Sequence, residues 1–217
     1  MSLHHLHTLA KEIKGFLTRD EAEALYALGK ECASLGPCLE IGSYCGLSTL
    51  YLGAGVRESG GVLFTIDHHK GSEEHQPGEE YHDPELFDRD VGSMNSFPAL
   101  QRTLRLAGLE DAVVSIVASS ALAARGWATP LSLVFIDGGH SLESAVTDYR
   151  SWATWVRPGG ILAIHDIFID PSQGGQAPYE IYKLALSSGL FEDLPMINTL
   201  GCLQRTMNYS SEKVHCR

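Results

Sequence analysis

Two aspartates and two histidines stand near the ends of predicted buried strands, where they could perform metal or acid–base chemistry. Asp137 and Asp166 each follow a short apolar run, His165 precedes Asp166, and His140 comes one short turn after Asp137. Neighbouring parallel strands end at one edge of a sheet, where open α/β sheets bind ligands. Carboxylate oxygens at that edge suit Mg²⁺, Mn²⁺ or Ca²⁺, and a bound dication lowers the pKa of a coordinated hydroxyl.

A glycine-containing stretch earlier in the chain is typical of a ligand-binding loop between a strand and a helix. Residues 38–41 read as the end of a buried strand, and a helix begins at Leu47. Between them, Gly42 and Gly46 let the backbone turn tightly beside a ligand. The pattern lacks the Gly-x-Gly-x-x-Gly of pyrophosphate sites and the Gly-Lys-Ser/Thr of triphosphate sites. It therefore predicts a nucleoside-like ligand without phosphate.

Two acidic residues flank this loop in the predicted fold. Glu40 precedes the first glycine, and Asp67 ends the next strand, 61–67. Asp67 follows Gly46 by 21 residues, close to the spacing of about 20 at which an acid binds ribose hydroxyls. Together the two acids could hold a cationic amino group and a ribose. S-adenosylmethionine (SAM) carries both groups.

Three stretches in order make the chain resemble the class I SAM-dependent methyltransferases. Residues 40–49, Glu-Ile-Gly-Ser-Tyr-Cys-Gly-Leu-Ser-Thr, resemble the cofactor loop of the catechol and caffeoyl-CoA O-methyltransferase group. Residues 134–141, Val-Phe-Ile-Asp-Gly-Gly-His-Ser, are similar to a signature of a related branch that includes sugar O-methyltransferases. Residues 157–166 are similar to the family's Pro-Gly-Gly turn and following strand. The resemblance covers roughly residues 37–206.

The resemblance implies a set of cofactor-binding residues at the ends of four strands. Most belong to the glycine loop, and the others end the second, third and fourth strands. The predicted residues are Glu40, Gly42, Ser43, Tyr44, Gly46, Ser48, Thr49, Asp67, His68, Ala118, Ser119 and Asp137. A simple helix cap is an equally good interpretation of Ser119.

The resemblance also implies a metal site, with two departures from the pattern. The catechol enzymes hold a metal with an acid after strand four and an Asp-Asn pair after strand five, and use a lysine as base. This chain offers Asp137, then His165 and Asp166 as metal ligands, with His140 in place of the lysine. The histidine ligand removes a negative charge and softens the site, so that a borderline metal such as Mn²⁺, Fe²⁺ or Zn²⁺ becomes possible. His140 and Asp137 are the predicted catalytic residues, since an imidazole of ordinary pKa about 6.5 accepts protons at neutral pH.

Interpretations in which these residues bind no metal also stay open. Asp137 could contact the cofactor or cap the next helix, and Asp166 could order the loop that follows it. His165 could be a hydrogen-bonded core residue. Catalysis would then rely on His140 without a metal, or on proximity alone.

Alternating strands and helices predict an α/β fold: a Rossmann-like, doubly wound, seven-stranded and mostly parallel sheet with a C-terminal antiparallel hairpin. Residues 1–36 are expected to form a helical segment packed on a SAM-binding domain of residues 37–217. Thr18 and Glu21 form a capping box at the second of its helices. This segment would cover the cofactor cleft or form the subunit contact of a homodimer. Further expected strands occupy 112–118, 131–136, 161–164, 191–198 and 200–205, and further helices begin near 97, 141 and 178.

Residues 68–94 are predicted to be an insertion that acts as a lid over the acceptor. Its first part, 68–84, contains no aliphatic side chain and no periodicity, so we expect no core there. It leaves the end of a strand, which favours a binding role over a disordered acidic loop. The predicted substrate contacts are His75, Tyr81 and His82.

Composition and charge indicate which kinds of partner and which cellular location to expect. The chain has 217 residues, of which 44% are hydrophobic, and a net charge of −11 without a basic cluster, which disfavours nucleic acid as a partner. No apolar run approaches a membrane span and no signal peptide is recognisable, so a cytoplasmic protein is expected. The five cysteines contain no Cys-x-x-Cys pair and are read as reduced thiols.

The sequence therefore predicts a SAM-dependent O-methyltransferase, assisted by a divalent metal, that acts on a small hydroxylated molecule such as a sugar or natural product. One alternative is metal-independent methylation of nitrogen or a carboxylate. Another, of a different class, is a SAM-binding regulatory protein without catalysis. A nicotinamide dehydrogenase is disfavoured because the pyrophosphate glycines are missing.

Overall fold

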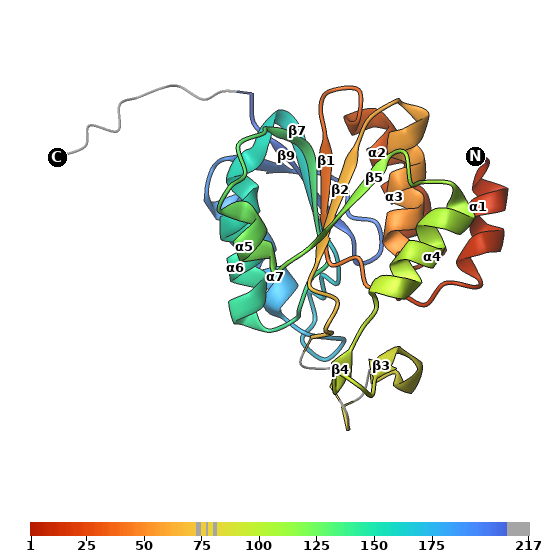
Figure 1. Ribbon diagram of the computed structural model, residues 1–217. Helices are drawn as coiled ribbons and strands as arrows, with labels where there is room; N and C mark the ends of the chain where they lie inside the picture. Colours follow the sequence, from red (N-terminus) through yellow and green to blue (C-terminus); the bar gives the residue numbers. More distant parts are fainter. Residues whose placement is uncertain (73–74, 77, 80–81, 208–217) are drawn as a thin grey trace.

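A seven-stranded sheet forms the centre of the computed structural model (Figure 1), which describes residues 1–72, 75–76, 78–79 and 82–207. The strand order is β5-β2-β1-β6-β7-β9-β8. The strands are β1 (Cys38–Ile41), β2 (Leu63–Asp67), β5 (Val113–Val117), β6 (Leu131–Ile136), β7 (Val156–Ile164), β8 (Phe191–Asp193) and β9 (Gly201–Arg205). The first five are parallel, whereas β9 pairs antiparallel with both β7 and β8. The predicted fold class is therefore confirmed.

Strand boundaries differ from the prediction mainly in the C-terminal hairpin. Strand β8 ends at Asp193, because the chain then turns away from β9 and returns through a single bridge between Ile197 and Leu200. Strand β7 begins at Val156, earlier than predicted, and its pairing with β6 is irregular between Leu131 and Leu133. This irregular part contains the Pro-Gly-Gly sequence, in which Gly159 has a positive φ of 78°.

Helices cover both faces of the sheet in two layers (Figure 1). One layer contains α1 (Leu3–Ala10), α2 (Arg19–Cys32), α3 (Leu47–Glu58) and α4 (Phe97–Ala107), and the other contains α5 (Ser120–Ala124), α6 (Leu142–Trp152) and α7 (Ala177–Ser187). Each layer buries its own hydrophobic cluster against the sheet. The sheet is thus covered as an open α/β fold requires.

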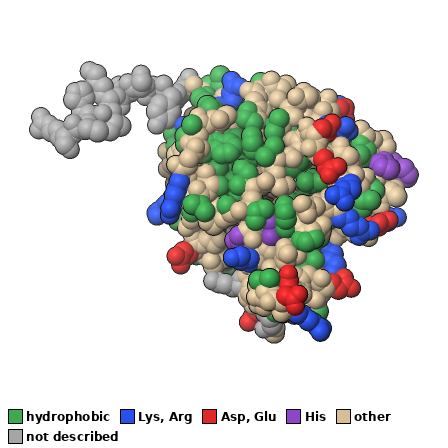
Figure 2. Space-filling view, viewed as in Figure 1, with side chains coloured by type: hydrophobic (Ala, Val, Ile, Leu, Met, Phe, Trp, Pro, Cys, Tyr) green, Lys and Arg blue, Asp and Glu red, His purple; other side chains and the backbone are tan. Residues whose placement is uncertain are grey.

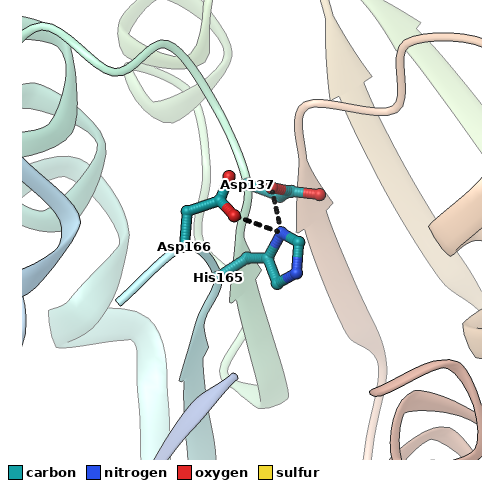
Figure 3. Close-up of side chains that lie close together, drawn as sticks. All are labelled: Asp137, His165 and Asp166. Atoms are coloured by element: carbon teal, nitrogen blue, oxygen red, sulfur yellow. Dashed lines mark hydrogen bonds and ion pairs between the residues drawn. The ribbon is translucent and has the colours of Figure 1, made fainter. Parts of the chain in front are cut away.

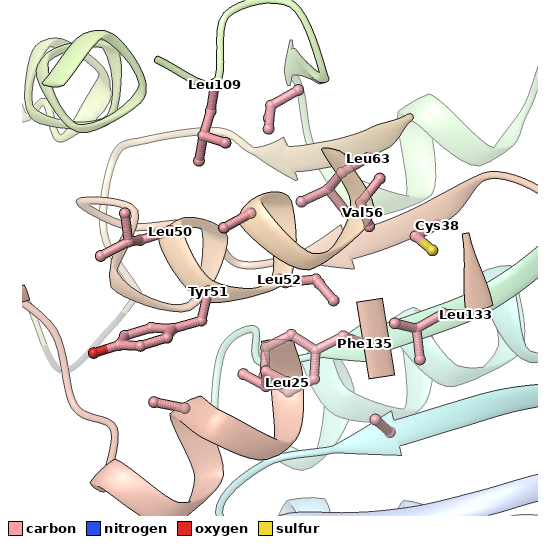
Figure 4. Close-up of a cluster of buried hydrophobic side chains, with 14 of the residues drawn as sticks. Leu25, Cys38, Leu50, Tyr51, Leu52, Val56, Leu63, Leu109, Leu133 and Phe135 are labelled. Atoms are coloured by element: carbon pink, nitrogen blue, oxygen red, sulfur yellow. The ribbon is translucent and has the colours of Figure 1, made fainter. Parts of the chain in front are cut away.

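The N-terminal helices share the core of the sheet. Leu25 on α2 packs in one buried cluster with Leu52 on α3 and Phe135 on β6 (Figure 4). Helices α2 and α3 approach closely because Gly55 has no side chain: a Cβ there would lie 2.1 Å from the carbonyl oxygen of Tyr26. Residues 1–36 therefore contribute directly to the interior that supports β1 and β6.

The insertion after β2 contains more structure than its composition suggests. A 3₁₀ turn (η2, Pro84–Leu86) leads into a two-stranded ribbon of β3 (Phe87–Asp88) and β4 (Ser93–Met94). His69 is buried despite the expectation of no core, because its Nδ1 hydrogen-bonds with the Ser96 hydroxyl at 2.8 Å and its ring packs on Phe97. The base of the insertion is thereby fixed to the start of α4.

Strand β5 forms an open edge of the sheet, and its outer part is weakly covered. Val114 and Val117 are 45% and 54% exposed, and Leu122 on the short helix α5 is 55% exposed. Figure 2 shows hydrophobic side chains gathered on one face of the molecule. Within the described residues, no helix has the length and apolar character needed to cross a membrane.

Candidate active site

A cavity of about 520 Å³ lies along the carboxyl ends of β5, β2, β1 and β6. This is the edge at which open α/β sheets bind ligands, and the volume lies within the usual range for small-molecule sites. Among the predicted cofactor-binding residues, those that line it are Gly42, Tyr44, Asp67, His68, Ala118, Ser119 and Asp137. Ser119 is also a helix cap, since its side chain accepts a hydrogen bond from the Leu122 amide. The cap is therefore confirmed, and contact of Ser119 with the cofactor stays a prediction.

The glycine loop is shaped by a close approach between two strand ends. Gly42 has φ 90°, and a Cβ there would lie 2.0 Å from the carbonyl oxygen of Asp137. The loop then holds Asp67 in place, because the Tyr44 amide donates to Oδ2 at 2.9 Å and the His69 amide donates to Oδ1 at 2.7 Å. The Asp67 carboxylate faces the cavity with both oxygens positioned, as a ribose-binding acid requires.

Glu40 has different surroundings from those predicted for a cofactor contact. Its carboxylate is fully buried and accepts hydrogen bonds from the hydroxyls of Ser48 at 2.7 Å, Thr49 at 2.6 Å and Thr65 at 2.6 Å. Neither Glu40 nor Thr49 lines the large cavity or the smaller one described below. Burial raises the Glu40 pKa to about 7, although the three hydroxyls oppose this effect. The structure thus places Glu40 beneath the loop, where it joins β1 to α3 and β2.

A second cavity of about 100 Å³ adjoins the first. The two share part of their lining, which includes Gly42, Tyr44, Asp137 and His140. The N-terminal segment closes the smaller cavity with residues 14–17, which is consistent with the expected covering of the cleft. Lys14 also forms an ion pair with Glu85 of the insertion at 2.6 Å. A molecule in the smaller cavity would therefore contact the N-terminal segment and would lie next to the larger cavity.

The smaller cavity also contains a buried polar atom from the glycine loop. Ser43 and Ser48 both line this cavity. The Ser43 hydroxyl is buried and has no hydrogen-bond partner within the described residues. A buried hydroxyl without a partner is costly, so this position favours a polar ligand group.

The predicted metal ligands lie together at the ends of β6 and β7. Figure 3 shows one nitrogen of the His165 ring facing the carboxylates of both Asp137 and Asp166. Its Nδ1 lies 3.0 Å from Asp137 Oδ1 and 3.6 Å from Asp166 Oδ1. One ligand atom from each of the three residues lies within 4.8 Å of the others. The structure therefore brings the three predicted ligands together, and their binding of a metal stays a prediction.

A buried glutamate completes this cluster from the N-terminal side. Glu21 Oε2 lies 3.4 Å from His165 Nε2, and the two side chains are 1% and 4% exposed. The sequence indicated only that Glu21 closes a capping box with Thr18, a prediction that the structure confirms. Its other oxygen accepts hydrogen bonds from the amide and hydroxyl of Thr199 at 2.9 and 2.7 Å. This second role was missed because its partners are distant in sequence.

These carboxylates decide the charge of His165. Burial alone would lower the pKa of its imidazole, but Asp137, Glu21 and Asp166 outweigh burial and raise the pKa to about 11. Without a metal ion, the ring is therefore an imidazolium that donates to Asp137. The cation partly neutralises the three acids that surround it.

The residues of this cluster fit a divalent metal. Two carboxylates and an imidazole nitrogen form a mixed donor set, and the opposite ring nitrogen faces Glu21, as ligating histidines usually face a carboxylate. A bound ion would displace the Nδ1 proton of His165, so binding would release a proton. The donor set is suited to Mn²⁺, Fe²⁺ or Zn²⁺ as well as Mg²⁺.

His140 lies on the wall shared by the two cavities and is held by Asp166. The His140 Nε2 atom is 3.1 Å from Asp166 Oδ2, and the two side chains are 35% and 26% exposed. Burial raises the Asp166 pKa, but His140 and His165 more than compensate and leave it below its ordinary value. Asp166 also adopts a positive φ of 57°. For a residue other than glycine, such strain is commonly retained at functional sites.

The three predicted substrate residues are placed differently from one another. His75 lines both cavities, hydrogen-bonds with the Ser72 hydroxyl at 2.8 Å and packs beside the Tyr44 ring. His82 lines neither cavity, because its ring nitrogen bonds to the His75 carbonyl at 3.0 Å. His82 therefore contacts the backbone of His75 and not the cavities. Tyr81 lies outside the described residues.

Comparison with known proteins identifies the family. A family model described as a methyltransferase domain matches residues 39–167, more than half of the chain. The chain belongs to this methyltransferase family. The resemblance inferred from the three motifs is therefore confirmed, and the chain is a methyltransferase of the Rossmann-like class.

Solved structures with the same fold include proteins crystallised with cofactor. Rv0187 from MTB, described as cofactor-bound, is 16% identical, with a TM-score of 0.65 over 95% of this methyltransferase and 90% of that chain. The O-methyltransferase from Bacillus cereus, in complex with S-adenosylhomocysteine (SAH), is 16% identical, with a TM-score of 0.61 over 94% and 90%. The O-methyltransferase TomG from Streptomyces achromogenes, in complex with SAM, is 16% identical, with a TM-score of 0.60 over 94% and 89%. At these identities the similarity establishes the fold.

Proposed function

We propose that this methyltransferase transfers the methyl group of SAM to a hydroxyl of a small polar acceptor, such as a sugar or natural product. The observation that carries the proposal is the position of His140, which lies on the wall between the two cavities and is held by Asp166. The larger cavity would hold the methyl donor and the smaller one the acceptor. A base between them is where deprotonation of a hydroxyl is needed.

Several features support SAM as the occupant of the larger cavity. Asp67 lines this cavity and presents a fixed carboxylate suited to ribose hydroxyls. The similar structures named above include one in complex with SAM and one in complex with SAH. The loop also lacks the glycines that a pyrophosphate needs.

The proposed chemistry is a displacement at a methyl carbon. The acceptor oxygen bonds to the methyl carbon, the carbon–sulfur bond breaks, and its electron pair stays on sulfur, which gives neutral SAH. His140 accepts the hydroxyl proton. If its Nε2–H donates to Asp166, the tautomer is fixed with Nδ1 as the basic atom. The remaining contribution of the protein is alignment of the two reactants.

Asp137, His165 and Asp166 would hold a divalent ion in the metal-assisted form of this proposal. When bound, the ion would supply a positive charge that lowers the pKa of an acceptor hydroxyl. The fit of the donor set supports this assignment.

The lining of the smaller cavity suits a hydroxylated acceptor. Lys14, Ser72 and His75 offer polar groups, while Phe16 offers an aromatic ring. This mixture favours a molecule with both hydroxyl groups and a flat or apolar face. A purely apolar acceptor would leave the polar groups without partners.

The test compares His140→Ala with a control histidine variant. His5→Ala changes an exposed side chain on α1 that lines neither cavity. Release of SAH is measured with a panel of catechols, sugars and other hydroxylated acceptors, and SAH affinity is measured by calorimetry. We expect His140→Ala to lower kcat by about 10²- to 10⁴-fold, with SAH affinity nearly unchanged, and His5→Ala to match the wild type.

Three outcomes would contradict parts of the proposal. SAM binding without turnover on any acceptor would favour the regulatory alternative. Unchanged kcat in His140→Ala would remove its role as base. Activity that survives a chelator would remove the metal, whereas loss on chelation and recovery with Mg²⁺ or Mn²⁺ would support it.

A further inference from the structure

Strand β5 ends the sheet on one side, and its outer edge lacks protection. Because β5 is the first strand in the sheet order, no strand of the described residues pairs with this edge. Val114 and Val117 are 45% and 54% exposed, and residues 112–124 contain no charged residue and no proline. Figure 2 shows hydrophobic side chains on the face where β5 lies in Figure 1. Charges, prolines or a covering element normally keep such an edge from pairing with another chain.

The opposite edge of the same sheet has this protection. It is formed by β8, which has only three residues, and two of them are the exposed acids Glu192 and Asp193. Short strands and charged side chains are common features that prevent pairing between sheet edges. The contrast between the two edges favours a partner strand at β5.

The hydrogen bonds between β5 and β2 show which peptide groups of β5 point outward. Leu63 N donates to Ala112 O at 2.9 Å, and Ala118 N donates to Asp67 O at 3.2 Å. The peptide groups of alternate residues in a strand point to opposite sides. Every second residue from 112 to 118 therefore faces β2, and the residues between them face the open edge.

Three residues of β5 thus present their peptide groups at the open edge: Val113, Ser115 and Val117. The Val113 amide is used within the chain, because it donates to Leu109 O at 3.0 Å. Within the part of the chain that the structure describes, the amides of Ser115 and Val117 donate to no other group. These two amides and the carbonyls of all three residues can therefore bond to a further strand.

We propose that two copies of this chain pair through β5 in antiparallel orientation, with Ser115 opposite the partner's Ser115 across a two-fold axis. Each Ser115 amide then donates to the carbonyl of the partner's Ser115, and each Val117 amide donates to the carbonyl of the partner's Val113. The same register places Val114 opposite the partner's Ile116. Apolar pairs of this kind stabilise antiparallel strands. The contact is self-complementary, as a two-fold interface requires.

The charges around this edge also favour a second copy as the partner. The chain has a net charge of −11, so most of its surface would repel another copy, whereas β5 itself is uncharged. Glu110 and Asp111, which precede β5, are paired with Arg105 and Arg57 of the same chain, and Arg125 follows α5. Antiparallel pairing brings the start of one β5 beside the end of the other. Acidic and basic side chains would therefore lie at each end of the contact.

The proposed contact is independent of the proposed function, but it adjoins the larger cavity. Ala118 and Ser119 follow β5 directly and line that cavity. Pairing would join the two sheets into one and hold the end of β5 from its outer side. The subunit contact would then lie at β5, and not in the N-terminal segment that the sequence suggested.

Sedimentation equilibrium at micromolar concentration measures whether the wild type is a dimer. Val117→Lys places a charge where an apolar pair would form, and the control Leu184→Lys changes an exposed leucine on α7. We expect dimers of the wild type and the control, and a dissociation constant for Val117→Lys that is higher by about 100-fold or more. Ser115→Pro should act similarly, because it removes an outward amide and leaves the bonds to β2 in place. Circular dichroism establishes that each variant is folded.

Cross-linking tests the register of the two strands. The background is Cys216→Ser, since the four other cysteines are buried. Ser115→Cys then places two thiols opposite each other, with Cα atoms about 5.5 Å apart, which is within the range for a disulfide. The two thiols of the control Val117→Cys would be separated by four residues, or roughly 13 Å. Mild oxidation should give a covalent dimer of Ser115→Cys and none of Val117→Cys.

Three results would overturn the inference. The first is a monomeric wild type, which would leave the β5 edge to a different protein. The second is a folded Val117→Lys with the dissociation constant of the wild type. The third is a Ser115→Cys variant that forms no covalent dimer. If Val117→Lys and Ser115→Pro fail to fold, the cross-link decides.

Discussion

The buried carboxylate of Glu40 gives a prediction about stability that is independent of activity. The Glu40 carboxylate accepts hydrogen bonds from three hydroxyls. Burial raises its pKa from the ordinary 4.5 to about 7. The folded protein therefore retains a proton that the unfolded chain loses at lower pH. Substitution by glutamine preserves the shape of the side chain and removes the titration.

The sign and size of the change in unfolding free energy with pH follow from the difference between the Glu40 pKa in the folded and unfolded states. Because the folded-state pKa is the higher one, the stabilising contribution is complete below pH 4.5 and is lost as the pH rises to about 7. At about 1.4 kcal/mol per pH unit, the loss is on the order of 3 kcal/mol. The stability of Glu40→Gln relative to the wild type should therefore rise by about this amount between pH 4.5 and 8.

Urea denaturation followed by tryptophan fluorescence at several pH values measures this difference. Subtracting the two profiles cancels the titration of all other groups that the substitution leaves unchanged. The control Glu31→Gln alters an exposed glutamate on α2 and should give a profile parallel to that of the wild type. If the Glu40→Gln profile were also parallel, Glu40 would titrate as in the unfolded chain and the assigned effect of burial would be refuted.

Three further substitutions test the supports of the site by denaturation. Gly42→Ala should destabilise the fold by about 1–3 kcal/mol and weaken SAH binding, because φ is 90° and the new methyl group meets the Asp137 carbonyl; wild-type values would contradict this strain. Trp152→Phe removes the donor to Ser120 and should cost about 1 kcal/mol or more, whereas a neutral result would mean that the bond contributes nothing. Thr18→Ala breaks the capping box and should cost about 1 kcal/mol, and an unchanged midpoint would show that the cap is dispensable.

Much of the fold could be predicted from the sequence because its signals are local. Apolar runs marked the strands, glycines marked the loop after β1, and the capping box marked α2. Which face a side chain points to is harder to predict in β1, since all four residues, including Glu40, are buried. Alternation between polar and apolar positions is absent there, so nothing in the pattern showed that Glu40 points beneath the loop.

The candidate site was predictable where its residues follow strand ends. Asp137, His165 and Asp166 were expected together because parallel strands end at one edge. Glu21 was not expected at the site, since it lies in a helix and meets its partner through packing of that helix on the sheet. The capping box alone explains why a glutamate occupies position 21. Nothing in the sequence pattern therefore indicated its contact with His165.

The junction between α1 and α2 brings two parts of the site together within one short span of chain. Residues 14–17 border the smaller cavity, and the next four residues lead through the Thr18 cap to the carboxylate beside His165. One continuous segment of eight residues therefore supplies both a wall of the smaller cavity and a charged partner of His165.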